Sequence, residues 1–344
     1  MSKDDKLGRF ISESAKLSAL ELSHHRLDIQ SFALSPLSLL YYLGWQTYEL
    51  AYALGIKSPQ KPHSPIICVG NLTVGGMGKS PLTIALASDL VRAGFQVVIG
   101  ASGYGSPRSQ GASLAPDGPL NPLEWGDEPA MIRWLLPEIP IIVGRARVKA
   151  AELCAKQFPD AVLLMDDGFQ HKPLKKDISI LIDPPKVANP LCLPAGPYRE
   201  PKSHRSRADF LLPDDIELDF SGYGLVDANL SPAPLDAGSK VQIITAIANP
   251  FRLMVTAETL GLTVVHGRNY PDHHPLQEPG LLKEFDPKIP IITTAKDWVK
   301  LRERTDIGQF NVRIVHLPAK INPPRFVEDT LAPRLHEIKK AKGA

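Results

Sequence analysis

Residues 65–86 read P-I-I-C-V-G-N-L-T-V-G-G-M-G-K-S-P-L-T-I-A-L, and this segment indicates the fold class. The apolar run I-I-C-V-G predicts a buried strand, and the glycines after it predict a tight turn. Leu82, Leu86 and Leu90 then recur at the spacing of a helix. A second apolar run, V-V-I-G at 97–100, completes a strand–helix–strand unit. The pattern predicts an α/β fold of the P-loop NTPase type, a mostly parallel sheet flanked by helices.

The glycine-rich turn is predicted to bind phosphate. It reads T-V-G-G-M-G-K-S, and backbone N–H groups at such a strand-to-helix turn can surround phosphate oxygens. In this interpretation Lys79 reaches the β- and γ-phosphates of a nucleotide and Ser80 ligates Mg²⁺. Thr73 replaces the first glycine of the usual pattern, but the order of strand, loop, Lys-Ser and helix favours nucleotide binding over a chance turn. The predicted nucleotide-binding residues are Thr73, Val74, Gly75, Gly76, Met77, Gly78, Lys79, Ser80 and Pro81.

Two adjacent aspartates follow a later apolar run. The run A-V-L-L-M at 161–165 predicts a buried strand, and Asp166 and Asp167 come directly after it. P-loop proteins hold Mg²⁺ from this position, although paired acids are also common in turns. The phosphate loop upstream favours the metal role and leaves open which aspartate touches the ion. A further apolar run at 178–182 predicts another strand of the same sheet.

Length and composition predict two unequal domains. The chain has 344 residues, 43% of them hydrophobic, which is enough for two cores. The Gly/Ser/Pro-rich stretch 102–122 is predicted to be a long functional loop, and 221–240 a linker. Four apolar runs after that linker, at 241–247, 262–265, 289–294 and 312–317, predict a smaller α/β domain. The expected organisation is an extension over 1–34 without an assigned function, a helix over 35–56, a P-loop domain over 57–235 and the smaller domain over 236–344.

The helix expected at 35–56 carries Leu and Tyr but also Gln46 and Glu49, so it is too polar for a transmembrane span. Aromatic residues with apolar bodies and polar tips suit the boundary between lipid and water. Two interpretations stay open, a helix in the membrane interface and a helix packed on its own domain. The aromatic residues in question are Tyr41, Tyr42, Trp45, Tyr48 and Tyr52.

Charge and cysteine usage bear on the expected partners and compartment. Lys and Arg number 39 against 37 acids, a net charge of +2, which gives no reason to expect nucleic acid as a partner. Cys68, Cys154 and Cys192 have no metal or redox spacing, which favours buried thiols in a reducing compartment. The polar N-terminus predicts no cleaved secretory signal, so we expect the active site to face the cytoplasm. Nothing in the sequence indicates a protein partner.

Several motifs together resemble those of the tetraacyldisaccharide 4'-kinases, which phosphorylate the 4'-hydroxyl of a tetraacylated glucosamine disaccharide 1-phosphate. The resemblance covers about residues 36–305, and D-D-G-F-Q-H joined to L-P-A-G-P-Y-R-E-P is more specific than the phosphate loop. The motifs are V-G-N-L-T-V-G-G-M-G-K-S-P (69–81), G-D-E-P (126–129), D-D-G-F-Q-H (166–171), L-P-A-G-P-Y-R-E-P (193–201), A-I-A-N-P-F-R (246–252), Y-P-D-H-H (270–274) and T-A-K-D-W-V-K-L (294–301).

The resemblance implies an ATP- and Mg²⁺-dependent lipid kinase of lipid A biosynthesis, peripheral on the cytoplasmic face of the inner membrane and touching it through 35–56. It implies Asp127 as the base for the lipid hydroxyl, helped by His273, although Asp127 could also be a helix N-cap. His273 with its neighbours is a poor zinc site because adjacent side chains diverge. The implied residues for MgATP are Lys79, Ser80, Asp166 and Asp167, and those for substrate are Asn71, His171, Arg199 and Glu200.

Alternatives remain open at this point. Arg199 and Glu200 could be a solvated ion pair instead of a substrate contact. Ser102, Met77 and Ala295 depart from the resemblance, where arginine, a small hydroxyl residue and glutamate are usual. These departures keep open a family member that binds nucleotide and lipid without turnover. A different class, a membrane-associated P-loop ATPase or nucleotide switch, would explain the phosphate loop but not L-P-A-G-P-Y-R-E-P or D-H-H.

Overall fold

The computed structural model describes Phe10, Ser12, Ser14 and residues 27–343, except 76, 77 and 184–186, and only the backbone of Gln30. Gly76, Met77 and most of the extension expected over 1–34 therefore lie outside the described residues. The chain divides into two compact units. Unit 1 consists of Met1–Leu22, Pro119–Leu135 and Phe220–Pro318, and unit 2 consists of Ser23–Gly118, Leu136–Asp219 and Ala319–Ala344.

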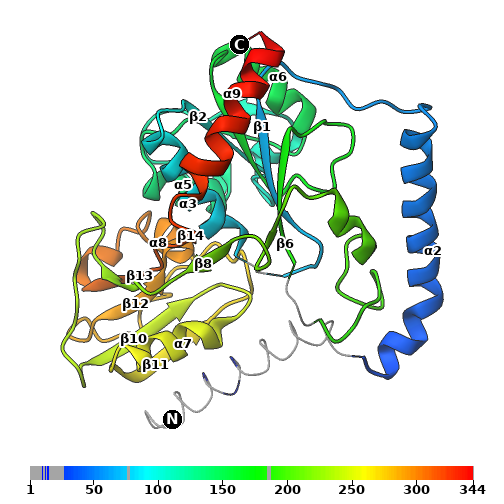
Figure 1. The fold of residues 1–344 in the computed structure, drawn as a ribbon. Coiled ribbons are helices and arrows are strands. Elements are labelled where there is room, and N and C mark those ends of the chain that lie inside the picture. The colour runs from blue at the N-terminus through cyan, green and yellow to red at the C-terminus, as the bar shows by residue number, and fades with distance from the viewer. Residues whose placement is uncertain are drawn as a thin grey trace. The chain divides into compact units, whose positions relative to one another are not determined.

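Unit 2 is built on a seven-stranded sheet in the order β3-β4-β2-β5-β1-β6-β7 (Figure 1). Neighbouring strands are parallel except for β3, which runs antiparallel to β4. The strand order reverses at β1, and in open α/β sheets ligands bind beyond the carboxyl end of the strand at that point. The strands are β1 (Ile66–Asn71), β2 (Val97–Ala101), β3 (Ser113–Leu114), β4 (Ile141–Val143), β5 (Val162–Asp166), β6 (Ile178–Ile182) and β7 (Phe210–Leu212).

Helices cover this sheet, and its central strands are buried throughout. Every residue of β1, β2, β5 and β6 is buried, which explains why the sequence shows continuous apolar runs there and confirms those predicted strands. The three cysteines are buried free thiols, as predicted. The other elements of unit 2 are α2 (Ile29–Ala53), α3 (Lys79–Arg92), α6 (Arg147–Gln157), α9 (Ala332–Lys342), the short helices η1 (Pro107–Gln110), η2 (Lys202–Arg207) and η4 (Val327–Leu331), and the strand pair β8 (Glu217–Asp219) with β14 (Lys320–Asn322).

Unit 1 contains a five-stranded sheet in the order β11-β10-β12-β13-β9, parallel except for β9. Alternate strand residues pack on its two faces, Ile244 and Ile291 in one cluster and Ile243 and Ile292 in the other. Phe10 is buried in the second cluster, against Gly267. The elements are β9 (Gly224–Val226), β10 (Lys240–Thr245), β11 (Thr263–Asn269), β12 (Ile291–Thr294), β13 (Val312–His316), α4 (Pro122–Trp125), α5 (Asp127–Leu135), α7 (Pro250–Thr259), α8 (Ala295–Leu301) and η3 (Ile307–Gln309).

The boundaries of the units differ from those expected from composition. The segment Pro119–Leu135 belongs to unit 1, and α9 returns the chain to unit 2, so neither unit is one continuous stretch. The predicted linker over 221–240 is wrong in part, because β9 lies within it and pairs with β13 through buried Leu225 and Val226. The stretch 102–122, predicted to be a loop, contains η1 and β3. Short strands without an alternating pattern leave little signal in a sequence.

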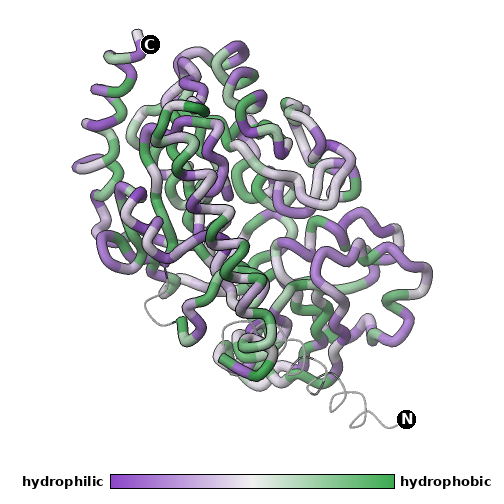
Figure 2. Tube along the Cα trace, turned by 90° about the vertical axis from the view of Figure 1, so that its right-hand side faces the viewer, coloured by the Kyte–Doolittle hydropathy of each residue, from purple (hydrophilic) through white to green (hydrophobic). Residues whose placement is uncertain are grey.

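Helix α2 has two unlike faces. Residues directed at the rest of unit 2 are polar or aromatic, whereas the opposite side exposes large apolar residues, Ile29 at 88% and Phe32 at 71% among them. Figure 2 views the molecule from the side on which α2 stands in Figure 1 and colours the hydrophobic residues along the helix green. The helix therefore packs on its own unit, as one of the two interpretations expects, and presents apolar surface on its outer side, while the membrane-interface interpretation stays a prediction. Among the described residues, no helix has the length and apolar character that crossing a membrane requires.

Candidate functional site: a phosphate loop in one unit and an acid–histidine pair in the other

The predicted phosphate loop joins β1 to α3. Gly75 and Gly78 have φ values of 107° and 89°, a backbone conformation that side chains disfavour. Gly78 caps α3, and Lys79 and Ser80 are the first residues of that helix, so its N-terminal N–H groups face the loop. The side chain of Lys79 donates to Asn71 Oδ1 at the end of β1, at 3.2 Å. The described part of the loop, with Gly75, Gly78 and the start of α3, thus has a backbone conformation that suits a phosphate site.

Asp167 lies close to Lys79, as predicted for a metal and phosphate site. Its Oδ2 is 3.9 Å from Lys79 Nζ, and its Oδ1 accepts a hydrogen bond from Arg199 at 2.7 Å. Burial pushes the pKa of Asp167 upward, but the charges of Lys79 and Arg199 outweigh burial and hold the pKa below 3.8. Asp167 also has a φ of 53°, in the left-handed region where aspartate is one of the tolerated residues. The carboxylate is therefore ionised and bracketed by two cations at neutral pH.

Asp166, the last residue of β5, is buried beside the first helix after the loop. Thr83 of α3 donates to its Oδ1 at 3.4 Å. Arg147, which sequence reasoning missed, lies at the same sheet edge and donates to the carbonyl oxygens of Asp166 at 2.7 Å and Asp167 at 3.1 Å. Because parallel strands end on one edge, side chains far apart in sequence meet there. Arg147 starts α6, shortly after β4 ends at Val143, and an arginine at a helix start after an apolar run was the signal available in the sequence.

Glu200 is fully buried at 0% exposure and is held by several donors, which rules out the alternative of a solvated ion pair for this residue. Gln170 donates to Glu200 Oε1 at 2.9 Å, and His204 Nδ1 lies 3.0 Å from Glu200 Oε2, which also contacts Arg207. Gln170 donates in addition to the carbonyl oxygen of Asn71, at 2.8 Å. Glu200 is thus linked to the end of β1 through a single side chain.

His171 follows Gln170 but takes a different environment. Its Nε2 is buried without a hydrogen-bond partner among the described residues. Burial, together with the charges of Lys176 and Arg147, lowers the pKa of His171 below 6.5, so the ring is neutral at neutral pH. Among the described residues, the His171 Nε2 atom therefore has no hydrogen bond to Lys79, Asp167 or Arg199.

Unit 1 brings Asp127 and His273 together from 146 residues apart. Asp127 is the first residue of α5 and is only 6% exposed, and its two carboxylate oxygens lie 3.1 and 3.0 Å from His273 Nδ1. His273 has a φ of 62°, in the left-handed region where histidine is one of the tolerated residues. The predicted pairing of these two residues therefore has the geometry of an oriented acid–histidine pair.

Two lysines that sequence reasoning missed complete this cluster. Lys296 Nζ lies 3.6 Å and Lys300 Nζ 3.9 Å from Asp127 Oδ2, and both project from α8. Each has a second carboxylate, since Lys296 pairs with Asp272 and Lys300 with Asp297, both at 2.9 Å. Their spacing of four residues in T-A-K-D-W-V-K-L places them on one helix face, a signal present in the sequence.

The charges in this cluster fix its protonation states. Burial pushes the pKa of Asp127 upward, but the hydrogen bond from His273 and the charges of both lysines outweigh it, so the pKa lies below 3.8. The hydrogen bond to Asp127 in turn raises the pKa of His273 above 6.5. Asp272 also lies 3.5 Å from His273 Nε2, so both ring nitrogens face carboxylates. The two carboxylates therefore fix the orientation of the ring.

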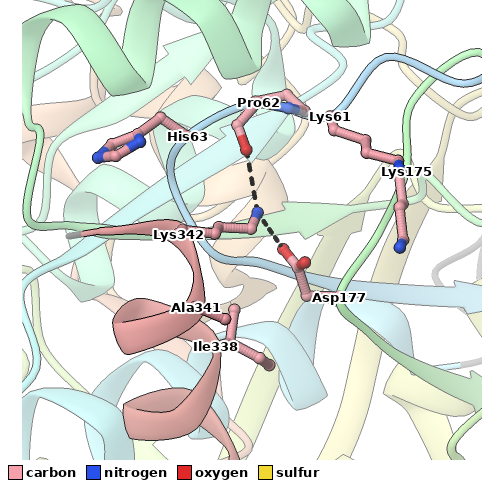
Figure 3. A pocket seen from close by; sticks show the side chains of 8 residues that line it. All are labelled: Lys61, Pro62, His63, Lys175, Asp177, Ile338, Ala341 and Lys342. Carbon is pink, nitrogen blue, oxygen red and sulfur yellow. Dashed lines mark hydrogen bonds and ion pairs between the residues drawn. The ribbon is translucent and has the colours of Figure 1, made fainter.

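A cavity of about 380 Å³ in unit 2 contains none of the predicted site residues. Its lining includes Lys61, Lys175 and Asp177, and Lys342 of α9 donates there to Asp177 at 2.7 Å and to the carbonyl oxygen of Pro62 at 3.0 Å (Figure 3). Lys342 is therefore engaged in holding α9. The residues that line this cavity belong to neither of the two clusters described above.

Known proteins of one family are similar to this chain. A family model described as tetraacyldisaccharide-1-P 4'-kinase matches residues 30–336. Proteins named tetraacyldisaccharide 4'-kinase from Verminephrobacter eiseniae and Shewanella amazonensis are 34% and 32% identical over 79% of this chain, which spans 66% and 84% of their lengths. The crystal structure of LpxK from Aquifex aeolicus in complex with ATP matches with a TM-score of 0.74 and 26% identity, over 90% of this chain and 99% of that one. The chain therefore belongs to the tetraacyldisaccharide-1-P 4'-kinase family.

Proposed function

We propose that this protein transfers the γ-phosphate of MgATP to the 4'-hydroxyl of tetraacyldisaccharide 1-phosphate. The observation that carries the proposal is the Asp127–His273 pair, because a buried, ionised carboxylate held by a histidine can accept the proton of an acceptor hydroxyl. Family membership supports the same activity over the alternative of a P-loop ATPase or switch. The Aquifex aeolicus relative binds ATP, which supports ATP as the phosphoryl donor here.

The residues of unit 2 suit MgATP. Lys79 and the α3 N-terminus would hold the phosphates, and Ser80, Asp166 and Asp167 supply the oxygen ligands that Mg²⁺ prefers. The low pKa of Asp167 keeps that ligand ionised. These residues would hold Mg²⁺ where it would supply positive charge to the transferred phosphoryl group. Arg199, already 2.7 Å from Asp167, would add a planar donor for phosphate oxygens.

On the acceptor side, Asp127 would accept the proton of the lipid hydroxyl. A carboxylate whose pKa is lowered is a weak base, so its proposed role is to orient the acceptor hydroxyl and to take its proton as the phosphoryl group transfers. His273 fixes the carboxylate through Nδ1, and the lysines of α8 keep it ionised. We assign Asn71 and Glu200 to maintaining the phosphate-side geometry, from their contacts with Lys79 and Gln170. His171 lacks such a contact, so its assignment to substrate has no support from geometry.

We place the protein at the cytoplasmic face of the inner membrane, with the lipid-facing contact on α2. The outer side of this helix exposes Ile29, Phe32, Leu37, Leu40 and Leu50. A continuous apolar face on a helix that otherwise packs against protein matches a helix lying in the interface. The aromatic residues named from the sequence contribute less than expected, because Tyr41, Trp45, Tyr48 and Tyr52 are partly buried.

The test is transfer of labelled γ-phosphate from MgATP to tetraacyldisaccharide 1-phosphate in detergent micelles, comparing wild type with Asp127→Ala and Lys79→Ala. We expect labelled lipid from the wild type and a loss in both variants. Loss in Lys79→Ala should be accompanied by weakened nucleotide binding, whereas Asp127→Ala should bind nucleotide normally. Lipid-independent ATP hydrolysis without labelled lipid would instead support the ATPase alternative.

A further inference from the structure

The inner side of α2 carries polar groups that reach the phosphate-side residues of unit 2. Ser38 donates to the carbonyl oxygen of Cys192 at 2.6 Å, and the Trp45 ring lies 6.1 Å from the His204 ring, edge to face. The helix is therefore polar toward protein and apolar toward its surroundings, the reverse of an ordinary surface helix. Polar contacts are directional, so they fix the helix in one position more tightly than apolar packing alone would.

A first chain of contacts runs through Tyr41. Its hydroxyl donates to the carbonyl oxygen of Arg199 at 2.5 Å. The backbone N–H of Arg199 donates to the carbonyl oxygen of Leu72, immediately before the phosphate loop, at 2.7 Å. The Arg199 guanidinium donates to Asp167, also at 2.7 Å. Arg199 is thus fixed by α2, by the start of the loop and by the carboxylate proposed for the metal.

A second chain runs through Glu49, which contacts Lys172 and lies 2.8 Å from Arg207. Arg207 also contacts the buried Glu200. The ligand atoms of Glu49, Glu200 and His204 lie within 4.8 Å of one another, a spacing that a metal ion could use. Arg207 contacts the carboxylates of both Glu49 and Glu200, so its guanidinium supplies the positive charge that offsets their negative charges.

From Glu200 the second chain continues to the phosphate loop. Gln170 donates both to Glu200, at 2.9 Å, and to the carbonyl oxygen of Asn71, at 2.8 Å. The Asn71 side chain accepts from Lys79 at 3.2 Å. Hydrogen-bonded contacts therefore run without a break from α2 to the lysine proposed for the β- and γ-phosphates.

We propose that Tyr41 and Glu49 are positioning residues that couple the packing of α2 against the rest of unit 2 to the affinity of the nucleotide site. The inference rests on the proposed function, which assigns Lys79, Asp167 and Arg199 to MgATP. Charged donors stabilise phosphate best when their geometry is fixed in advance. Here α2 contacts Arg199 through Tyr41 and Arg207 through Glu49. Because the same helix presents its apolar side outward, binding to a membrane surface and binding of nucleotide become linked.

The linkage makes a reciprocal prediction. If vesicles raise the affinity for nucleotide by some factor, nucleotide must raise the affinity for vesicles by the same factor. Substitutions that cut the inner contacts should abolish this factor, while Leu40→Ser on the outer side should weaken vesicle binding and leave nucleotide affinity without vesicles unchanged. The two sides of one helix thus have separable roles.

The experiment measures calorimetric affinity of the full chain for a Mg²⁺-bound, non-hydrolysable ATP analogue, with and without vesicles of anionic phospholipid. We expect about 3- to 10-fold weaker binding for Tyr41→Phe, which loses one hydrogen bond to a neutral acceptor. Glu49→Gln should weaken binding about 10-fold or more, because it leaves a charge-assisted network incomplete. Tyr52→Phe is the matched control for the hydroxyl, since the Tyr52 hydroxyl bonds only Tyr48 among the described residues, and exposed Glu337→Gln is the control for charge.

Melting temperatures separate positioning from a structural role. Lower melting temperatures with wild-type nucleotide affinity in Tyr41→Phe and Glu49→Gln would overturn the inference, as would equal affinities throughout. Failure of the wild type to bind the analogue would overturn both this inference and the nucleotide assignment. Normal binding with no lipid phosphorylation would overturn only the proposed function. If Glu49→Gln does not fold, Tyr41→Phe alone decides the outcome.

Discussion

Asp127→Asn keeps the size of the side chain and removes its charge, so it isolates the proposed role of the carboxylate. The carboxylate lies 3.6 Å from Lys296 Nζ and 3.9 Å from Lys300 Nζ. A charge pair at this separation is worth about 4 kcal/mol at an effective dielectric constant near 20. Both lysines keep a second carboxylate at 2.9 Å. We therefore expect Asp127→Asn to lower the free energy of unfolding by about 1–3 kcal/mol, which is less than the loss from breaking an isolated buried pair.

The effect of Asp127→Asn on catalysis should be larger than its effect on stability. An amide cannot take a proton from the acceptor hydroxyl, and a general base contributes about 10²- to 10⁴-fold, or about 3–5 kcal/mol of barrier. The assay is kcat for lipid phosphorylation at saturating MgATP, with the melting temperature measured in parallel. Asp272→Asn is the control, because Asp272 also contacts Lys296 and His273 but is 36% exposed and has no proposed proton to accept.

A kcat for Asp127→Asn within tenfold of the wild-type value would refute the assignment of Asp127 as base. Equal losses in Asp127→Asn and Asp272→Asn would show instead that the cluster acts only through its total charge. The reasoning also requires the Kd for a Mg²⁺-bound ATP analogue to be unchanged in Asp127→Asn. A weakened Kd would mean that the substitution acts on the nucleotide.

Three further predictions follow from the described contacts. Arg199→Lys keeps a charge but loses the planar guanidinium whose Nη1 donates to Asp167, so we expect about 10- to 100-fold lower kcat/KM for MgATP, measured by transfer kinetics. The pKa of His273 is raised in the folded state, so protonation of the ring stabilises the fold fully below pH 6.5 and progressively less as pH rises through the folded-state pKa. The melting-temperature difference between wild type and His273→Gln should therefore shrink over that rise in pH. Phe10→Ala should cost about 3–5 kcal/mol of unfolding free energy by denaturant titration, because Phe10 is 1% exposed.

The sheet of unit 2 could be predicted from the sequence because its strands are buried on both faces. Such strands read as unbroken apolar runs, and β1, β5 and β6 appear where those runs lie. The division of the chain could not be predicted in the same way, since membership of a unit depends on packing between distant segments. Residues 119–135 show no change in composition, yet α5 packs on α8, some 160 residues later, and so enters unit 1.

The candidate site also has one part that a local sequence pattern predicts and one part that depends on contacts between distant residues. The phosphate loop is local, because the glycines, Lys79 and the helix start are adjacent, and elementary backbone geometry is enough to recognise it. The pairing of Asp127 with His273 came only from the family resemblance, because no local pattern relates two residues 146 positions apart. Lys296 and Lys300 lay between these cases: their spacing predicts a shared helix face, but the acid that this face would meet depends on how α5 packs. A buried carboxylate that is kept ionised by several cations is thus the feature least visible in sequence, because its cations lie far from it along the chain and carry no meaning until the acid is in place.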